Sequence, residues 1–78
     1  MSDYAPIPCI EHERLEFAVL RRQRLALKIS GANGEIRELV VLPTDVATRD
    51  QAEWLSYRED GGTTGVVRLD RILSALPL

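Results

Sequence analysis

The sequence predicts a mostly β fold with one N-terminal helix, an α+β arrangement whose strands form a small, partly open barrel. Apolar residues at helical spacing occupy residues 9–20, and several later segments alternate apolar and polar residues between glycine-rich turns. Strands in so short a chain must cover their edges, and they do so by coiling into a barrel. The helix is then expected to lie across one end or edge of the sheet.

The size and composition indicate one small globular domain spanning residues 1–78. The chain is 45% hydrophobic and 28% charged, and its formal net charge of −2 provides no general basic field for a phosphate backbone. A single cysteine cannot form an internal disulfide, so a reducing compartment, the cytoplasm, is expected. No apolar run approaches the roughly 20 residues of a membrane span, and no membrane association is expected.

The N-terminal region divides into an arm and a helix. Residues 1–8 contain two prolines and no periodicity, which predicts an extended arm. Tyr4 and Ile7 either pin this arm to the domain or move when a partner binds. Residues 9–20 then form an acidic helix with one apolar stripe. The stripe consists of Leu15, Ala18 and Val19.

Residues 24–76 are expected to form the sheet and a terminal turn. Residues 24–30 alternate cleanly and predict a half-buried strand. Asn33 and Gly34 supply the backbone angles of a hairpin turn. Residues 35–43 form the second strand, and its alternation fails toward the end, which predicts a bulge or a bend in the sheet.

The C-terminal half contains two further strands and an ambiguous end. A polar connection is expected over residues 44–51, followed by strands at residues 52–59 and 64–70 with a glycine turn between them. Residues 69–76 fit either a helix or a last strand preceded by a helical turn.

Core positions follow from the same patterns. Trp54 and Tyr57 lie on opposite faces of one predicted strand, so at least one of them belongs to the core. Cys9, Leu15, Phe17 and Trp54 are assigned to the core or to anchoring of the helix.

Three possible reactive sites are weaker than their structural alternatives. Cys9 and His12 match the start of a zinc pattern, but a structural zinc needs about four ligands and the chain has no further cysteine or histidine. A nucleophilic pair needs an activated thiolate and a neutral base, whereas Cys9 lies between Pro8 and Ile10 and His12 lies among acids, which suits a surface contact better. Glu13 and Glu16 on a convex helix cannot enclose a substrate as a pair of catalytic carboxylates would. We therefore expect no enzyme, no metal and no cofactor.

Two charged groups follow one another along the chain. Both groups can be ordinary solvated faces. Alternatively, the acidic group forms a docking surface, or the basic group forms an RNA-binding strand. The acids of the helix are Glu11, Glu13 and Glu16. The bases that follow are Arg21, Arg22, Arg24 and Lys28.

The order of these segments resembles the Rho-binding antiterminators, the Rof or YaeO family of small bacterial inhibitors. The similarity extends from Tyr4 to about Ser74 and includes the acidic helix start between its flanking motifs. The motifs are "YAPIPC", "LEFA", "LALKI", "TDVATR", "AEWL" and "VRLDRI".

The resemblance implies an Sm-like bent sheet and a non-enzymatic function. It implies an inhibitor of transcription termination that binds the OB-fold domain of the hexameric Rho helicase at its primary RNA-binding site and blocks RNA loading. Such a protein does not contact nucleic acid directly, and we expect a monomer when it is free. The positions implied to contact Rho are Glu11, His12, Glu13 and Glu16. A further contact is expected from Arg49, in a loop beside the helix.

An alternative remains open at the level of sequence. A small Sm-like RNA-binding module would use the basic strand region of Arg21, Arg22, Arg24 and Lys28 instead.

Overall fold

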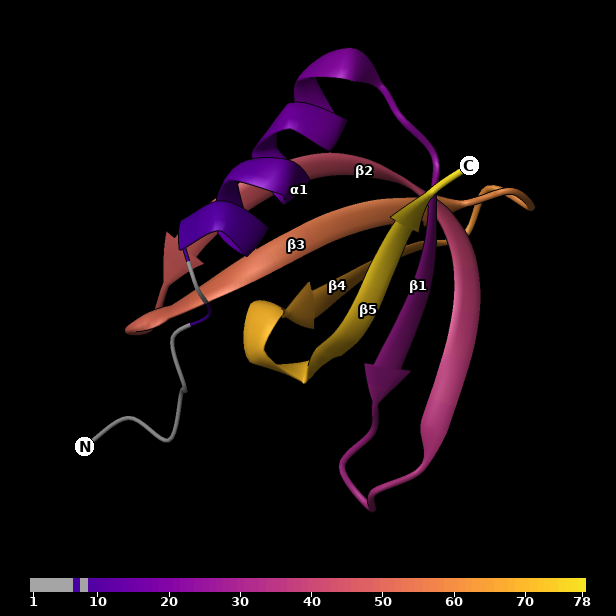
Figure 1. Cartoon of the computed structure of the whole chain (residues 1–78). Helices are drawn as coiled ribbons and strands as arrows, with labels where there is room; N and C mark the ends of the chain where they lie inside the picture. Colours follow the sequence, from indigo (N-terminus) through magenta and orange to yellow (C-terminus); the bar gives the residue numbers. More distant parts are fainter. Residues whose placement is uncertain (1–6, 8) are drawn as a thin grey trace.

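The computed structural model describes residues 7 and 9–78 (Figure 1). Within these residues one α-helix precedes a five-stranded antiparallel sheet, so the predicted mostly β class with an N-terminal helix and a small bent sheet is confirmed. The expected extended arm and Tyr4 lie outside the described residues, whereas Ile7 packs against the core. The elements are α1 (Cys9–Arg21), β1 (Leu25–Ser30), β2 (Ile36–Arg49), β3 (Ala52–Glu59), β4 (Thr64–Arg68), the 3-10 helix η1 (Leu69–Arg71) and β5 (Ile72–Pro77).

Helix α1 ends in a Schellman motif. The N–H of Gln23 donates to the carbonyl of Ala18 at 2.9 Å, and the N–H of Arg22 donates to the carbonyl of Val19 at 3.2 Å. Arg22 adopts a φ of +54°, the left-handed conformation that this motif requires and that glycine usually supplies. The motif turns the chain sharply from the helix into β1.

The sheet has the strand order β4-β3-β2-β1-β5 and is open, with β4 and β5 at its edges (Figure 1). The predicted hairpin between β1 and β2 is confirmed, but of the two expected turn residues, Asn33 and Gly34, only Gly34 has a positive φ. Gly34 has a φ of +83°, and its N–H donates to the carbonyl of Gly31 at 3.1 Å. The N–H of Gly31 in turn donates to the carbonyl of Glu35 at 2.7 Å, which closes the hairpin.

The expected polar connection over residues 44–51 is wrong, because β2 continues to Arg49. Its pairing with β3 shifts register between Pro43 and Asp45, where the sheet bends. The predicted irregularity is therefore a bulge inside one long strand. Beyond it the strand is largely exposed, which explains its polar composition.

A two-residue turn joins β2 to β3. Asp50 and Gln51 have φ angles of +51° and +63°, the pattern of a type I′ turn, which matches the twist of the flanking strands. Asp50 suits the first position of such a turn, but Gln51 occupies the second position, where glycine is usual. At the C-terminus, the alternative of a last strand after a helical turn is confirmed by η1 and β5.

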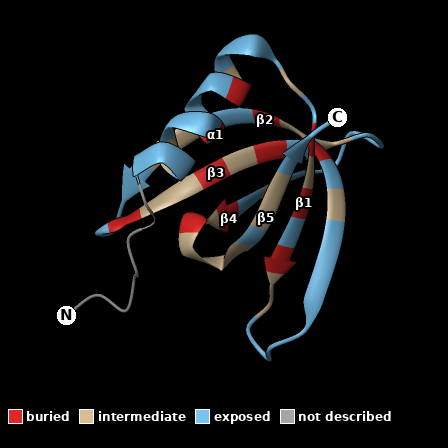
Figure 2. Cartoon of the chain, in the orientation of Figure 1, coloured by how far each residue is buried: buried red, intermediate tan, exposed pale blue. Residues whose placement is uncertain are grey.

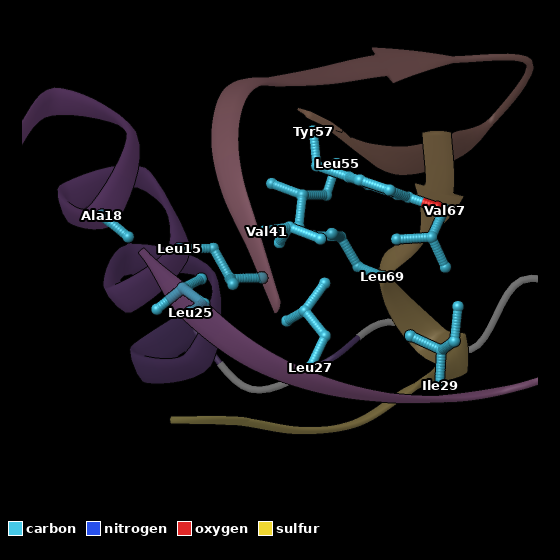
Figure 3. Packing of buried hydrophobic residues seen from close by; sticks show 10 residues of the cluster. All are labelled: Leu15, Ala18, Leu25, Leu27, Ile29, Val41, Leu55, Tyr57, Val67 and Leu69. Atoms are coloured by element: carbon cyan, nitrogen blue, oxygen red, sulfur yellow. The ribbon is translucent and has the colours of Figure 1, made fainter. Parts of the chain in front are cut away.

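The core fills the inside of the bent sheet, and α1 covers one end of it with Leu15 and Ala18 (Figures 2 and 3). Leu15 and Ala18 are buried, as predicted, and Tyr57 is the aromatic residue of the core at 7% exposure. The core assignment of Cys9 and Phe17 is wrong: both are exposed, because they point away from the Leu15 side of the helix. The remaining buried members of the cluster are Leu25, Leu27, Ile29, Val41, Leu55, Val67 and Leu69.

Candidate protein-binding surface

His12 ties the helix to the sheet. Its Nδ1 lies 2.6 Å from Oε1 of Glu16 on the next helical turn, and its Nε2 contacts Oε2 of Glu53 in β3. Oε2 of Glu53 is shielded from solvent. Within the described residues this oxygen has no hydrogen-bond partner, so its contact with the imidazole is one of proximity. His12 therefore fixes the position of α1 over the β2–β3 hairpin and orients Glu16.

The three predicted glutamates do not share one face. At about 100° per residue, Glu13 and Glu16 lie about 60° apart around the helix axis, whereas Glu11 lies about 160° from Glu13. Glu13 and Glu16 are exposed on the outer side of α1. Glu11 lies instead along the groove between α1 and β5. The structure thus brings Glu13 and Glu16 together with His12, and it separates Glu11 from them.

Arg49 is held by Trp54. Its guanidinium carbon lies 5.6 Å from the centroid of the indole ring, and its carbonyl accepts a 3.0 Å hydrogen bond from Nε1 of Trp54. Arg49 pairs with Ala52 across the strands, while Glu53 points to the opposite face of the sheet. Arg49 therefore belongs to the hairpin that contacts His12, but it projects from the other face. Trp54, assigned to the core from sequence, is half-buried in this contact.

The four bases of the alternative RNA-binding site have four separate roles. Arg24 forms an ion pair with Asp60, and Nζ of Lys28 lies 3.8 Å from Oε1 of Glu38 on the adjacent strand. The guanidinium of Arg21 packs over the ring of Phe17 at 5.5 Å, on the helix. Arg22, the fourth base, occupies the left-handed position that ends the helix. Carboxylates neutralise two of these cations, so the group is not a continuous basic strip.

Cys9 and His12, which match only the start of a zinc pattern, do not form a metal site with other described residues. Cys9 is a free, exposed thiol, and both ring nitrogens of His12 face carboxylates. Over residues 7 and 9–78, no three His, Cys, Asp or Glu side chains gather in a way that could hold a metal ion. In the same part of the chain, no helix has the length and apolar character needed to cross a membrane.

Sequence reasoning missed Glu53. It follows the strand periodicity of Leu55 and Tyr57, which places a carboxylate on the buried face of β3. The alternation of residues 52–59 already places the Glu53 carboxylate on this face. A carboxylate on a buried face needs a polar partner. The identity of the partner, His12, depends on how the helix docks.

Comparison with known proteins gave no match to a protein-family model and no match to a curated protein.

Proposed function

We propose that this protein is a non-enzymatic cytoplasmic inhibitor that binds the termination factor Rho at its primary RNA-binding site and suppresses Rho-dependent termination by blocking RNA loading. The sequence resemblance from Tyr4 to about Ser74 supports the proposal. One structural observation carries it. Glu13 and Glu16 stand close together on the exposed side of a helix that His12 fixes to the sheet.

The chemistry of such a contact is straightforward. A protein site that binds the phosphates of RNA presents Lys and Arg side chains, and carboxylates accept strong, charge-assisted hydrogen bonds from the same donors. An acidic helix can therefore compete with RNA for one set of cations. Charge complementarity also raises the association rate of the inhibitor with such a site.

Fixing the helix before binding reduces the entropy that is lost in the complex. In this proposal Glu13 and Glu16 provide the central charges, and His12 holds Glu16 in place. Glu11 and Arg49 lie at the periphery of the surface, since one faces the β5 side of the helix and the other projects from the opposite face of the sheet.

A competition experiment tests the proposal. Labelled oligo-dC is bound to purified Rho from the same organism, and the protein is titrated at two salt concentrations, with a parallel series that lacks Rho. We expect displacement that weakens at high salt and is lost in the Glu13→Lys/Glu16→Lys variant. The Arg21→Glu/Arg22→Glu variant is the matched control and should still displace the oligonucleotide.

Two results would contradict the proposal. The oligonucleotide could remain on Rho at saturating protein, in which case there is no competition. Direct binding of the oligonucleotide in the series without Rho, lost in Arg21→Glu/Arg22→Glu, would instead support the RNA-binding alternative.

A further inference from the structure

A groove separates α1 from β5. Its volume is about 960 Å³. Phe17 and Leu73 line the groove, although they are 54% and 53% exposed, so apolar surface is left open to solvent there. The groove is further lined by the apolar residues Leu15, Ala18, Leu25, Leu69, Ile72 and Ala75.

The β5 side of the groove is a free sheet edge. β5 pairs with β1 on one side and ends the strand order on the other (Figure 1). The N–H of Leu78 donates to the carbonyl of Arg24 at 3.1 Å, which sets the alternation of the antiparallel ladder. Ala75 then directs its N–H and carbonyl away from β1. These groups can bond to an added strand.

The α1 side of the groove carries cations. Arg14 and Arg21 are exposed, line the groove and lie two helical turns apart on the same side of the helix. Among the described residues, no carboxylate lies within ion-pair distance of either guanidinium. Glu11 is present on the same rim, but the two arginines outweigh it. The rim therefore favours a negatively charged partner.

We propose that this groove binds an extended, acidic peptide segment of a partner protein, which adds a strand to β5. Its apolar side chains, at alternate positions, pack on the groove lining, and a carboxylate meets Arg14 and Arg21. Main-chain bonds to the edge provide affinity, and the side-chain contacts provide specificity. Around the helix axis, Arg14 and Arg21 lie about 80–100° from Glu13 and about 140–160° from Glu16. The groove therefore uses other residues than the proposed Rho-binding surface, and the inference is independent of the proposed function.

A labelled peptide tests the inference with the full chain. The probe is a fluorescent octapeptide with leucine or valine at alternate positions and two glutamates, measured by anisotropy. A second probe has lysines in place of the glutamates. We expect the glutamate probe to bind at least about tenfold more tightly than the lysine probe, a difference of one decade in Kd. The Arg14→Glu/Arg21→Glu variant should reverse this preference, whereas the control Arg37→Glu/Arg58→Glu should not.

Backbone pairing is tested without changing the protein. N-methylation of the alternate peptide amides that face β5 should weaken binding at least about tenfold, and N-methylation of the other alternate set should not. Amide NMR shifts should map to β5 and to the Arg14 side of α1.

Several outcomes would overturn the inference. They are equal binding of the two probes, equal effects of the two methylation patterns, or NMR shifts at the β4 edge. Concentration-dependent self-association through β5 would also overturn it, because a second copy would then fill the groove.

Discussion

Nε2 of His12 in α1 contacts Oε2 of Glu53 in β3, and this contact joins the helix to the sheet on the side away from β5. Replacing His12 with alanine leaves a shielded carboxylate oxygen without its partner. We expect the free energy of unfolding to fall by about 1–3 kcal/mol, measured by urea denaturation.

The matched control is Glu16→Gln, which removes the charge of the exposed partner of the same histidine. Exposed pairs contribute little, so the change should be at most about 1 kcal/mol. The double variant His12→Ala/Glu53→Gln should lose less free energy of unfolding than the sum of the two single variants, because the Glu53 carboxylate is no longer charged. Full additivity would show that the two side chains do not interact.

A second prediction concerns the end of the helix. Arg22 has a φ of +54°, a conformation that glycine adopts without steric cost. Arg22→Gly should therefore raise the free energy of unfolding by about 0.5–1 kcal/mol. Glu13→Gly, inside the helix, should lower it by about 1 kcal/mol. Thermal denaturation of both variants shows whether each substitution raises or lowers the stability. Destabilisation by Arg22→Gly would argue against the left-handed conformation at the end of the helix.

A third prediction concerns the contact between Tyr57 and Gly65, which are directly opposite each other on β3 and β4. A Cβ atom on Gly65 would lie 2.5 Å from the hydroxyl oxygen of Tyr57 and 2.6 Å from its ring carbon Cζ. Because Tyr57 is buried, its ring cannot move aside freely. Gly65→Ala should cost about 1–3 kcal/mol of stability.

Gly61 provides the control for this substitution. A Cβ atom there meets no other atom within 4 Å, and its φ is not positive, so Gly61→Ala should not destabilise the fold. Equal melting temperatures for the two alanine variants would show that the ring of Tyr57 does not pack against Gly65.

Much of the fold was predictable because it depends on local patterns. The spacing of Leu15 and Ala18 identified the buried side of the helix, and Asn33-Gly34 identified the first hairpin. The second hairpin was not recognised, because Gln51 adopts a positive φ at the position where glycine normally follows the aspartate. There the pairing of two long strands outweighs local preference.

The candidate surface was predictable in part. Glu13 and Glu16 share the exposed side of a helix, which sequence spacing alone indicates. The same helical spacing places Glu11 on a different side of the helix. The contact of His12 with Glu53 and the pairing of Arg24 with Asp60 could not be predicted, because each joins segments whose approach is set by tertiary packing.

The position of Glu11 distinguishes it from the other two acids, and this difference gives a fourth prediction. If Glu13 and Glu16 make the central contacts with Rho, Glu11→Lys should change the displacement of oligo-dC by less than about threefold, since a peripheral charge is largely screened. Glu13→Lys/Glu16→Lys should abolish displacement, and circular dichroism should show both variants folded. Equal loss in both variants would contradict a surface centred on Glu13 and Glu16, because a partner on that side of α1 would not reach the β5 side.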